Sequence, residues 1–440
     1  MDRNSTEPQR AYPDALRVKH ILEQMFQGYT GCLGVRFWNG ETITLGRGSP
    51  AATIVFNTAK SFRNFVLRRD ALHFAEAHVQ GDVDVEGDLY ALLMQKAHLP
   101  SLTPSMRELF ALLLTVFSFN GGSAQAGDSH VPARWSKPLQ AFFSRRQSKA
   151  LNREAISFHY DVSNDFYRLW LDEQMLYSCA YFDHPDESLE QAQCDKLDHI
   201  CRKLRLKPGE RLLDIGCGWG ALICWAAQHY GVSAHGITLS RQQYEHAKNK
   251  IRDLGIEGQV TVELRDYRDL PEDASFDKVS SIGMFEHVGL KNLPVYFSAV
   301  RRALKPGGLF LNHGITNDEE GMRKTVGIEF IQRYVFPESE LETVSNVQRV
   351  MEQTNFEILD VESLRPHYAQ TLRHWVNRLE AQREKAIALV GEAKYRVWRL
   401  YMAGCAAQFE NGDIGVYQIL AANRRPGLAD VPLTRRDLYR

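Results

Sequence analysis

A glycine-rich turn is the clearest chemical signal in the sequence. The segment LLDIGCGWG, residues 212–220, places Asp214 near the end of an apolar run, and glycines follow at every second position. Glycine tolerates positive φ, and its missing side chain lets a ligand approach the backbone amides. The turn therefore predicts a small-molecule site, and the alternative is a turn that only packs a helix against a strand.

The glycine spacing separates this turn from a dinucleotide site. A dinucleotide fingerprint reads G-x-G-x-x-G and has an acidic residue about twenty positions later, at the end of the next strand. Here the glycines are Gly216, Gly218 and Gly220, and the next expected strand ends in Thr-Leu-Ser at residues 238–240. A nicotinamide or flavin dinucleotide is therefore not indicated.

Acidic and imidazole side chains further along could supply acid–base or metal chemistry. Glu286 and His287 are adjacent in FEHVG, and His313 follows in NHGIT. They lack the i, i+4 spacing of HExxH and no CxxC accompanies them, so a metal site is not indicated. Taken singly, His313 also fits a hydrogen-bonded structural histidine, and Tyr368 fits a loop anchor.

The elements that must position these residues form a repeating strand–helix pattern. The chain from Arg211 reads strand, glycine turn, helix, strand, and further strand-like runs are QVTVELRDY, FDKVSSIGMFEHV and GGLFLNHGI. Short β-rich runs between helical stretches imply parallel strands with crossover helices. We therefore expect a doubly wound, Rossmann-like α/β sheet, followed by two long helices over residues 370–408.

The N-terminal part has a different pattern. Alternating apolar and polar residues surround Asn39-Gly40, a hairpin signal, and residues 61–80 have helical spacing, which together predict a small α+β domain. Gly, Ser, Pro and Ala gather between residues 120 and 148 and predict a linker. The expected ranges are an N-terminal accessory domain at 1–120, a linker with a basic patch at 121–150, the α/β domain at 151–425 and a tail at 426–440.

Composition narrows the class of protein. The 440 residues are 44% hydrophobic and carry 53 Lys+Arg against 54 Asp+Glu, which argues against a disordered chain and against a nucleic-acid partner. The seven cysteines show no pairing pattern, so we expect a reducing, cytoplasmic compartment. The first residues lack the apolar core of a secretory signal, and the longest apolar run, Leu109–Phe119, is about half the ~20 residues of a spanning helix.

Several motifs together resemble one known family. DIGCGWG, GITLSRQQ and GMFEHVG are similar to motifs of class I methyltransferases that use S-adenosylmethionine, and within them of the cyclopropane fatty acid synthase family. The resemblance covers residues 155–425 closely and includes HYDVSNDFYRLWLD and YSCAYF. It implies a class I methyltransferase sheet with C-terminal helices and a smaller N-terminal domain. It also implies that S-adenosylmethionine is the cofactor.

The resemblance assigns residues to each part of this cofactor. Its sulfonium and zwitterionic tail call for acceptors and an acidic neighbour rather than a phosphate nest. Tyr177 and Ser178 match the methionine end, and the glycine turn, with Asp214 and Cys217, matches the backbone cradle. The ribose and adenine positions match Thr238, Leu239, Ser240 and Gln243, and the adenine cap matches Asp266 and Tyr267.

The implied reaction is methylation of an isolated carbon–carbon double bond. It leaves a carbocation that the enzyme must shield and then deprotonate. In the family a bound bicarbonate ion removes this proton, and its binding positions match Cys179, Glu286, His313, Ile315 and Tyr368. A carboxylate beside an anion repels it unless they share a proton, so we expect Glu286 to order His313 and the bicarbonate proton.

Cys405 is a weaker candidate. The resemblance places an active-site cysteine at this position, in YMAGCAAQFE. No base stands at a recognisable spacing and the proposed chemistry has no nucleophilic step, so we interpret Cys405 as a buried thiol lining the acyl channel.

The expected substrate is the acyl chain of an unsaturated phospholipid, which requires contact with a membrane. Residues 129–153 hold six basic and no acidic side chains, interleaved with aromatics, and basic residues contribute about 1 kcal/mol each near an anionic leaflet. We expect peripheral association with the inner face of the membrane. The alternatives are a solvated basic linker or an interdomain helix, and Leu109–Phe119 fits either a core helix or a membrane contact.

The sequence thus predicts an S-adenosylmethionine-dependent enzyme that forms cyclopropane rings in phospholipid acyl chains, and it is compatible with a homodimer. One alternative methylates the same alkene but yields a methylene or methyl-branched chain, because PESELET, residues 337–343, departs from the PNGxLPS form of ring-forming members. Small-molecule N-methylation is more distant, since an amine generates no carbocation. A lipid-binding protein with a vestigial methyltransferase domain is the non-enzymatic alternative.

Overall fold

The computed structural model describes residues 13–68, 70–101, 104–117, 163–319, 325–336, 340–427 and 429–439. Contacts divide the chain into two units, Met1–Pro138 with Glu392–Ala407, and Leu139–Gly391 with Gln408–Arg440. The basic stretch expected at residues 129–153 lies outside the described residues. The domain ranges expected from the sequence stay a prediction.

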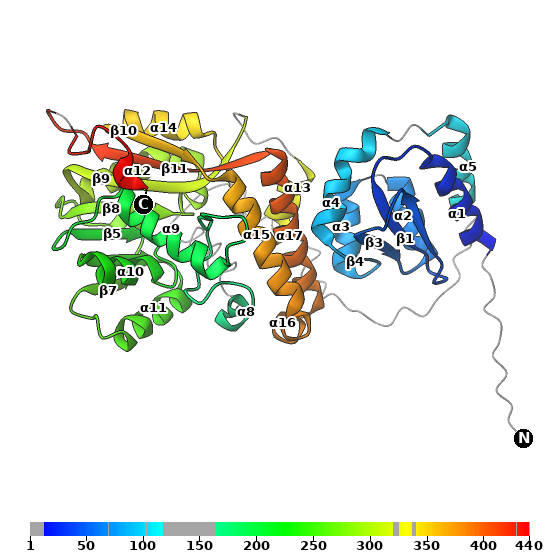
Figure 1. Cartoon of the computed structure of the whole chain (residues 1–440), viewed down its shortest axis with the longest axis horizontal. Coiled ribbons are helices and arrows are strands. Elements are labelled where there is room, and N and C mark those ends of the chain that lie inside the picture. The colour runs from blue at the N-terminus through cyan, green and yellow to red at the C-terminus, as the bar shows by residue number, and fades with distance from the viewer. Residues whose placement is uncertain are drawn as a thin grey trace, which may run out of the picture. The chain divides into compact units, whose positions relative to one another are not determined.

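The first unit is built on a four-stranded sheet (Figure 1). Its strands, in the spatial order β2-β1-β3-β4, are β1 (Cys32–Arg36), β2 (Thr42–Gly46), β3 (Ala52–Phe56) and β4 (Val83–Gly87). β1 and β2 form the antiparallel hairpin that the sequence predicts. At its turn Gly40 has a φ of 85°, and the Glu41 amide donates to Asn39 Oδ1 at 3.1 Å.

Helices cover this sheet. They are α1 (Pro13–Met25), α2 (Ala59–Arg68), α3 (Ala71–Gln80), α4 (Leu89–Met94) and α5 (Met106–Phe117), with the 3₁₀ helix η1 (Gln95–Ser101). Asp70 divides the helical run predicted at 61–80 into two helices. It caps the start of α3, because its side chain accepts from the Leu72 amide at 2.9 Å. Leu112 and Val116 of α5 are buried, so one face of the apolar run belongs to the core.

Part of a distant helix also belongs to the first unit. α17 (Glu392–Asn411) begins there, and Arg396 of this helix donates to the His78 carbonyl at 2.8 Å and to Asp84 Oδ2 at 3.1 Å. Arg399, one turn on, donates to the carbonyls of Val85 and Gly87 at 3.0 and 2.9 Å. These contacts explain why residues 392–407 group with the N-terminal sheet.

The second unit contains a seven-stranded sheet in the order β10-β11-β9-β8-β5-β6-β7. The strands are β5 (Arg211–Ile215), β6 (Ser233–Thr238), β7 (Val260–Leu264), β8 (Phe276–Ile282), β9 (Leu304–Asn317), β10 (Phe356–Ser363) and β11 (Ile414–Asn423). β5 to β9 are parallel, as predicted, and β11 runs antiparallel between β9 and β10. The doubly wound fold class is confirmed, whereas β10 and β11 were not predicted from the sequence.

Two apolar cores lie on the two faces of this sheet. One packs α9 (Leu189–Lys203), α10 (Ala221–Tyr230) and α11 (Arg241–Asp253) through residues such as Leu212 and Leu311. The other packs α12 (Leu293–Ala303) and α14 (Val344–Gln353) through Leu213 and Phe310. Since successive strand residues point to opposite faces, adjacent leucines of β5 enter different cores. The shorter elements are α8 (Asn164–Arg168), α13 (Val326–Tyr334), η3 (Tyr267–Asp269), η4 (Phe285–His287), η5 (Leu290–Asn292) and η6 (Arg436–Leu438).

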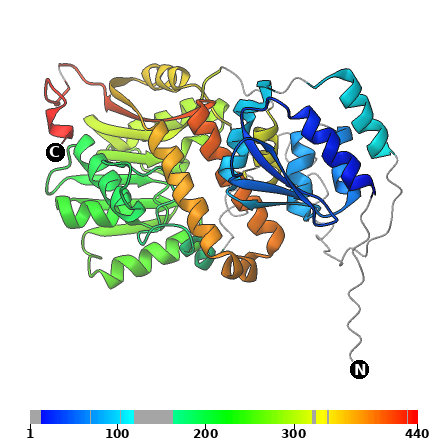
Figure 2. The same cartoon turned by 45° about the vertical axis from the view of Figure 1, so that its right-hand side comes forward.

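The C-terminal helices number three rather than the two expected over residues 370–408 (orange in Figure 2). α15 (Arg365–Ala381) and α17 are the long ones, and the short α16 (Arg383–Val390) lies between them. Gly391 separates α16 from α17 with a φ of 81°, which a helix cannot continue through. No helix in the described ranges is long and apolar enough to span a bilayer.

The strand order creates a crevice at the end of β5. β5 pairs with β6 on one side and with β8 on the other, so the order in which the strands are added reverses at β5. In open α/β sheets ligands bind outside the carboxyl ends of the strands at such a switch point. The glycine turn at residues 216–220 begins there.

We predict that Gly220→Ala lowers the free energy of unfolding by about 2 kcal/mol. Gly220 has a φ of 86°, and an added Cβ would stand 2.9 Å from the Ala247 Cβ on α11. Urea denaturation without ligand measures the change. Gly258→Ala is the control, because a Cβ added there would meet no atom within 4 Å and its φ is ordinary. Equal stability of the two variants would contradict the packing role.

Candidate active site

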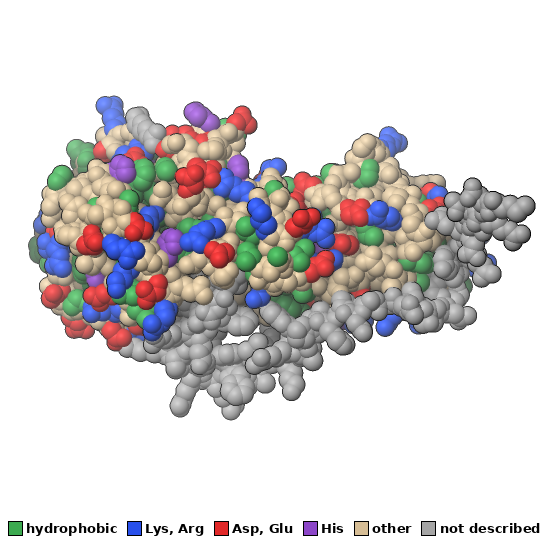
Figure 3. Space-filling model, turned by 90° about the horizontal axis from the view of Figure 1, so that it is seen from below, with side chains coloured by type: hydrophobic (Ala, Val, Ile, Leu, Met, Phe, Trp, Pro, Cys, Tyr) green, Lys and Arg blue, Asp and Glu red, His purple; other side chains and the backbone are tan. Residues whose placement is uncertain are grey.

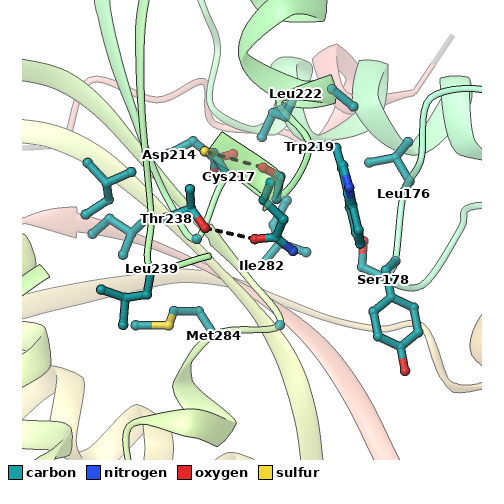
Figure 4. A pocket seen from close by; sticks show the side chains of 18 of the residues that line it. Leu176, Ser178, Asp214, Cys217, Trp219, Leu222, Thr238, Leu239, Ile282 and Met284 are labelled. Carbon is teal, nitrogen blue, oxygen red and sulfur yellow. Dashed lines mark hydrogen bonds between the residues drawn. The ribbon is translucent and has the colours of Figure 1, made fainter. Parts of the chain in front are cut away.

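A cavity opens at the carboxyl ends of β5, β6 and β8 (Figure 4). The space within it, including the open solvent at its mouth, is about 950 Å³. The residues expected at the cofactor that line it are Tyr177, Ser178, Asp214, Gly216, Cys217, Gly218, Thr238, Leu239, Gln243 and Tyr267. Ten of the thirteen residues expected at the cofactor therefore line one cavity.

The three glycines of the turn have different surroundings. A Cβ on Gly218, where φ is 54°, would meet no atom within 4 Å, and on Gly216, where φ is 82°, it would only touch Met284 at 3.5 Å. These two glycines leave the cavity open and the backbone accessible. Gly220 instead packs against Ala247 and does not line the cavity. The ligand and packing interpretations of the turn thus apply to different glycines.

Two other expected residues also lie outside the cavity lining. Ser240 caps α11, because its hydroxyl accepts from the Gln243 amide at 3.3 Å. Asp266 Oδ1 accepts from the Arg268 amide at 2.9 Å, and its carboxylate also holds the Arg268 guanidinium at 2.8 and 2.6 Å. Both residues therefore fix the backbone next to a lining residue, Gln243 in one case and Tyr267 in the other.

Polar groups occupy defined positions on the cavity wall. Thr238 Oγ1 donates to Gln243 Oε1 at 2.8 Å, which fixes the side-chain amide at the end of β6. Asp214 is 3% exposed and accepts from Ser280 Oγ at 2.7 Å. Burial raises the pKa of Asp214 to about 6, so this carboxyl is mostly ionised at neutral pH and becomes protonated in mildly acidic solution.

Part of the lining was not predicted from the sequence. Met175, Leu176, Trp219, Ile282, Met284 and His287 also face the cavity. Each lies in or directly beside one of the motifs YSCAYF, DIGCGWG and GMFEHVG. For Trp219, Ile282, Met284 and His287, proximity to the end of β5 or β8 was the signal that could have found them, whereas Met175 and Leu176 lie near no strand.

Glu286, His313 and Ile315 lie together behind this cavity. Glu286 follows β8 in η4, and its Oε1 accepts from the Ile315 amide of β9 at 2.7 Å. His313 Nδ1 lies 3.2 Å from Gln418 Nε2 on β11. Because an amide NH₂ donates, Nδ1 accepts and the imidazole proton is assigned to Nε2.

Within the described residues Glu286 and His313 hydrogen-bond to the Ile315 amide and to Gln418 rather than to each other, so the expected ordering of His313 by Glu286 stays a prediction. Glu286 Oε2 and His313 Nε2 are buried and have no hydrogen-bond partner within the described part of the chain. A buried polar atom without a partner calls for a ligand or water. Glu286 Oε2 can accept a hydrogen bond, and the His313 Nε2–H group can donate one.

Burial sets the charge of both groups. It raises the pKa of Glu286 to about 7 and lowers the pKa of His313 to about 3, with the Lys196 and Lys203 ammonium groups adding to the latter shift. At neutral pH His313 is therefore an uncharged imidazole. Glu286 exchanges between its acid and carboxylate forms.

Two further candidates lie near each other. Cys179 is fully buried, its thiol is 3.2 Å from the Ala180 carbonyl and 3.7 Å from the Leu364 carbonyl, and burial raises its pKa. The Tyr368 amide on α15 donates to the same Leu364 carbonyl at 3.1 Å. Leu364 thus connects Cys179 to the start of α15.

Cys405 is not brought to the cavity. It lies on α17, within the part that groups with the first unit, and it is absent from the lining. Burial raises the pKa of its thiol to about 12, so the thiol is protonated at neutral pH. This state does not suit a nucleophile.

An aromatic cluster links the cavity to Tyr368, and it was not predicted from the sequence. The Tyr177 ring lies 5.4 Å from Trp170 and 5.3 Å from Trp375, measured between centroids. Trp375 in turn lies 6.1 Å from Tyr368 in an edge-to-face arrangement. Aromatic faces attract cations, so this cluster suits a positively charged ligand or intermediate.

The sheet order, the antiparallel β11 and the glycine turn at the switch point define a class I, S-adenosylmethionine-dependent methyltransferase. The family model for mycolic acid cyclopropane synthetase matches residues 147–419. The chain belongs to this family, which confirms the resemblance to cyclopropane fatty acid synthases. A model for a domain of unknown function matches residues 18–99.

Individual relatives agree with this family. A probable fatty acid methyltransferase of Pseudomonas putida is 42% identical, over 93% of this chain and 96% of its own. The cyclopropane-fatty-acyl-phospholipid synthase of Escherichia coli is 40% identical over 60% of this chain and 66% of its own. The structure of mycolic acid cyclopropane synthase CmaA1 complexed with SAH and CTAB has a TM-score of 0.58 and 36% identity, covering 61% of this chain and 98% of that one.

We predict that Glu286 makes the protein less stable as pH rises. Its pKa is about 7 in the folded state against an ordinary value of 4.5, so the folded state binds the extra proton between these values. Stability is therefore lost as pH rises through this window, by about 3 kcal/mol. Glu286→Gln removes this loss, and urea denaturation at pH 5 and pH 8 in bicarbonate-free buffer measures it. The same pH dependence in both proteins would refute the burial effect.

Proposed function

We propose that this protein transfers the methyl carbon of S-adenosylmethionine to a cis double bond of an unsaturated phospholipid acyl chain and forms a cyclopropane ring. The observation that carries the proposal is the buried donor–acceptor pair of His313 Nε2 and Glu286 Oε2, next to the switch-point cavity. A methyltransferase acting on an amine needs no such pair, because it generates no carbocation.

The cavity suits S-adenosylmethionine, which supplies the methyl group. Gly216 and Gly218 leave space for the ligand at the backbone, and Asp214 offers the acidic neighbour. The Thr238–Gln243 pair offers polar groups for the ribose, and Leu239, with other apolar residues, suits the adenine ring. The CmaA1 structure with bound SAH supports this assignment.

Bicarbonate fits the second group of residues, and when bound it supplies the base for deprotonation. This ion accepts hydrogen bonds and also carries one hydroxyl. His313 Nε2–H would donate to it and Glu286 Oε2 would accept its hydroxyl proton. The family resemblance adds Cys179 and Tyr368 to this grip. Ile315 acts through Glu286, because its amide already donates to Oε1.

The protein residues add little charge around the reacting carbon. His313 is neutral and Glu286 is partly protonated at pH 7, because burial shifts the pKa of each, so neither strongly repels or traps a carbocation. The Tyr177 ring, which lines the cavity and packs against Trp375, would stabilise positive charge without acting as a nucleophile. Burial excludes water, which would otherwise add to the cation.

The segment that departs from the ring-forming motif touches the loop of Glu286. Residues 337–339 lie outside the described part, but the Glu340 amide donates to the Glu286 carbonyl at 3.4 Å, and its carboxylate accepts from the Leu290 amide at 3.0 Å. This segment therefore supports the backbone that positions the base. A methylene or methyl-branched product is the alternative outcome of the test below.

We predict that the protein, incubated with S-adenosylmethionine, bicarbonate and vesicles of cis-unsaturated phospholipid, adds one CH₂ to the acyl chains. Mass spectrometry of the fatty acid methyl esters should show no new alkene. His313→Ala should reduce kcat by about 100-fold or more, as expected for a lost base site. Its affinity for S-adenosylhomocysteine should stay unchanged. A product with a terminal alkene would show that the enzyme makes a methylene chain instead of a ring. Methylation of an amine alone would overturn the proposal.

Membrane docking completes the proposal, and α5 offers an apolar face for it. Met106, Phe110, Leu114 and Phe117 follow helical spacing and are 80%, 62%, 55% and 60% exposed. The Arg63 guanidinium lies 5.7 Å from the centre of the Phe117 ring, which places a cation beside this face. Such a pattern fits the interface of an anionic leaflet. On the surface seen in Figure 3, acidic and basic side chains are interspersed.

We predict that Phe110→Ser combined with Leu114→Ser reduces flotation with anionic vesicles at least fivefold, because the exposed face loses about 1.5 kcal/mol or more of apolar contact. Val295→Ser with Leu389→Ser is the matched control, since these side chains are 52% and 46% exposed in the second unit. Equal flotation of both double variants would remove α5 from the docking surface.

A further inference from the structure

A buried lysine lies behind the cavity wall, and neither the family motifs nor the mechanism above uses it. Lys196 on α9 is 0% exposed and does not line the cavity. Its Nζ donates to Ser178 Oγ at 2.8 Å. Ser178 does line the cavity, so the lysine reaches the ligand space only through this hydroxyl.

The direction of this hydrogen bond determines what Ser178 can do. An ammonium group only donates, so Ser178 Oγ accepts and its own proton is left for another acceptor. A cation behind the oxygen polarises the hydroxyl and strengthens it as a donor. Ser178 therefore presents a strengthened donor to a ligand in the cavity.

The backbone of this segment is held separately. Gln193, one turn before Lys196 on α9, donates to the carbonyls of Leu176 and Ser178 at 3.4 and 3.1 Å. Asp172 accepts from the amides of Gln174 and Leu176 at 2.8 Å each. The position of Ser178 thus rests on other residues, and Lys196 acts on its hydroxyl.

The position of Ser178 in the cavity indicates which part of the ligand it contacts. Figure 4 shows Ser178 and Trp219 across the cavity from Leu239 and Met284. The apolar side suits an adenine ring, so the opposite side faces the amino-acid tail. Within that tail the sulfonium and ammonium groups cannot accept a hydrogen bond, and the carboxylate can.

We propose that Lys196 is a positioning residue of the cofactor site, which directs the Ser178 hydroxyl proton toward the carboxylate of the bound cofactor. This inference rests on the proposed use of S-adenosylmethionine. The buried ammonium also supplies positive charge near that carboxylate. Desolvation lowers the pKa of Lys196 to about 8, while the nearby Asp172 and Asp214 favour its charged form, so it is mostly protonated at neutral pH.

Calorimetric titration with two ligands tests this role. S-adenosylhomocysteine has the amino-acid tail, and 5′-methylthioadenosine has the same thioether and nucleoside without it. Lys196→Met should raise the Kd for S-adenosylhomocysteine about tenfold, the value of one charge-assisted hydrogen bond, and change the Kd for methylthioadenosine less than about twofold. Ser178→Ala should show the same selective loss, and the double variant should lose no more than either alone.

Lys203→Met is the matched control, because Lys203 is 1% exposed on the same helix and pairs with Glu362 instead. It should bind both ligands like the unmodified protein. Equal weakening of both ligands by Lys196→Met would show a merely structural role, and no change in either would also overturn the inference. If Lys196→Met does not fold, Ser178→Ala still decides through its ligand selectivity. Failure of the unmodified protein to bind S-adenosylhomocysteine would instead refute the proposed function.

Discussion

Removal of water from ionisable side chains is the constraint on which the rest of the site depends. Asp214, Glu286, His313 and Lys196 are all at most 5% exposed, and desolvation is the largest cause of each pKa shift. Burying such groups costs several kcal/mol unless hydrogen bonds offset it. The fold meets this cost with fixed partners, Ser280, the Ile315 amide, Gln418 and Ser178, each from a different element. The site is therefore rigid because its polar groups cannot move without losing these partners.

Strand register places these partners. β8 aligns Ile282 with His313, and β11 aligns Gln418 with the same histidine, so His313 stands between the loop of Glu286 and the antiparallel strand. A shift by one residue would turn His313 to the other face of the sheet. Gly314 is also required, because a Cβ there would lie 3.0 Å from Glu286 Oε1 and would overlap the Phe285 ring. The chemistry of Glu286 thus depends on a neighbouring strand being free of side-chain bulk at one position.

The sequence predicted the parts of the fold that depend on local pattern. The strands β5 to β9, the hairpin at Asn39-Gly40 and the glycine turn follow from spacing within short windows. β10 and β11 were missed because they pair with each other and with β9 across long separations, and the Asn411-Gly412 turn before β11 follows a helix rather than a partner strand. Lys196 and Trp375 were missed for a related reason. Each lies on an ordinary amphipathic helix, and only tertiary packing gives the lysine its hydroxyl partner and the tryptophan its place between Tyr177 and Tyr368.

The same constraint relates the two halves of the proposed chemistry. The cofactor brings positive charge into the cavity, and the alkene becomes positive after methyl transfer, so the protein must hold both without offering a nucleophile. Protonated thiols, an imidazole whose Nδ1 lone pair already accepts from Gln418, and aromatic faces satisfy this condition, whereas a thiolate would react. Full positive charge is kept behind the wall at Lys196, where it can favour the cofactor's carboxylate without contacting the cation. Desolvation therefore does more than stabilise a binding site, since it also keeps the Cys179 thiol protonated and so a weak nucleophile.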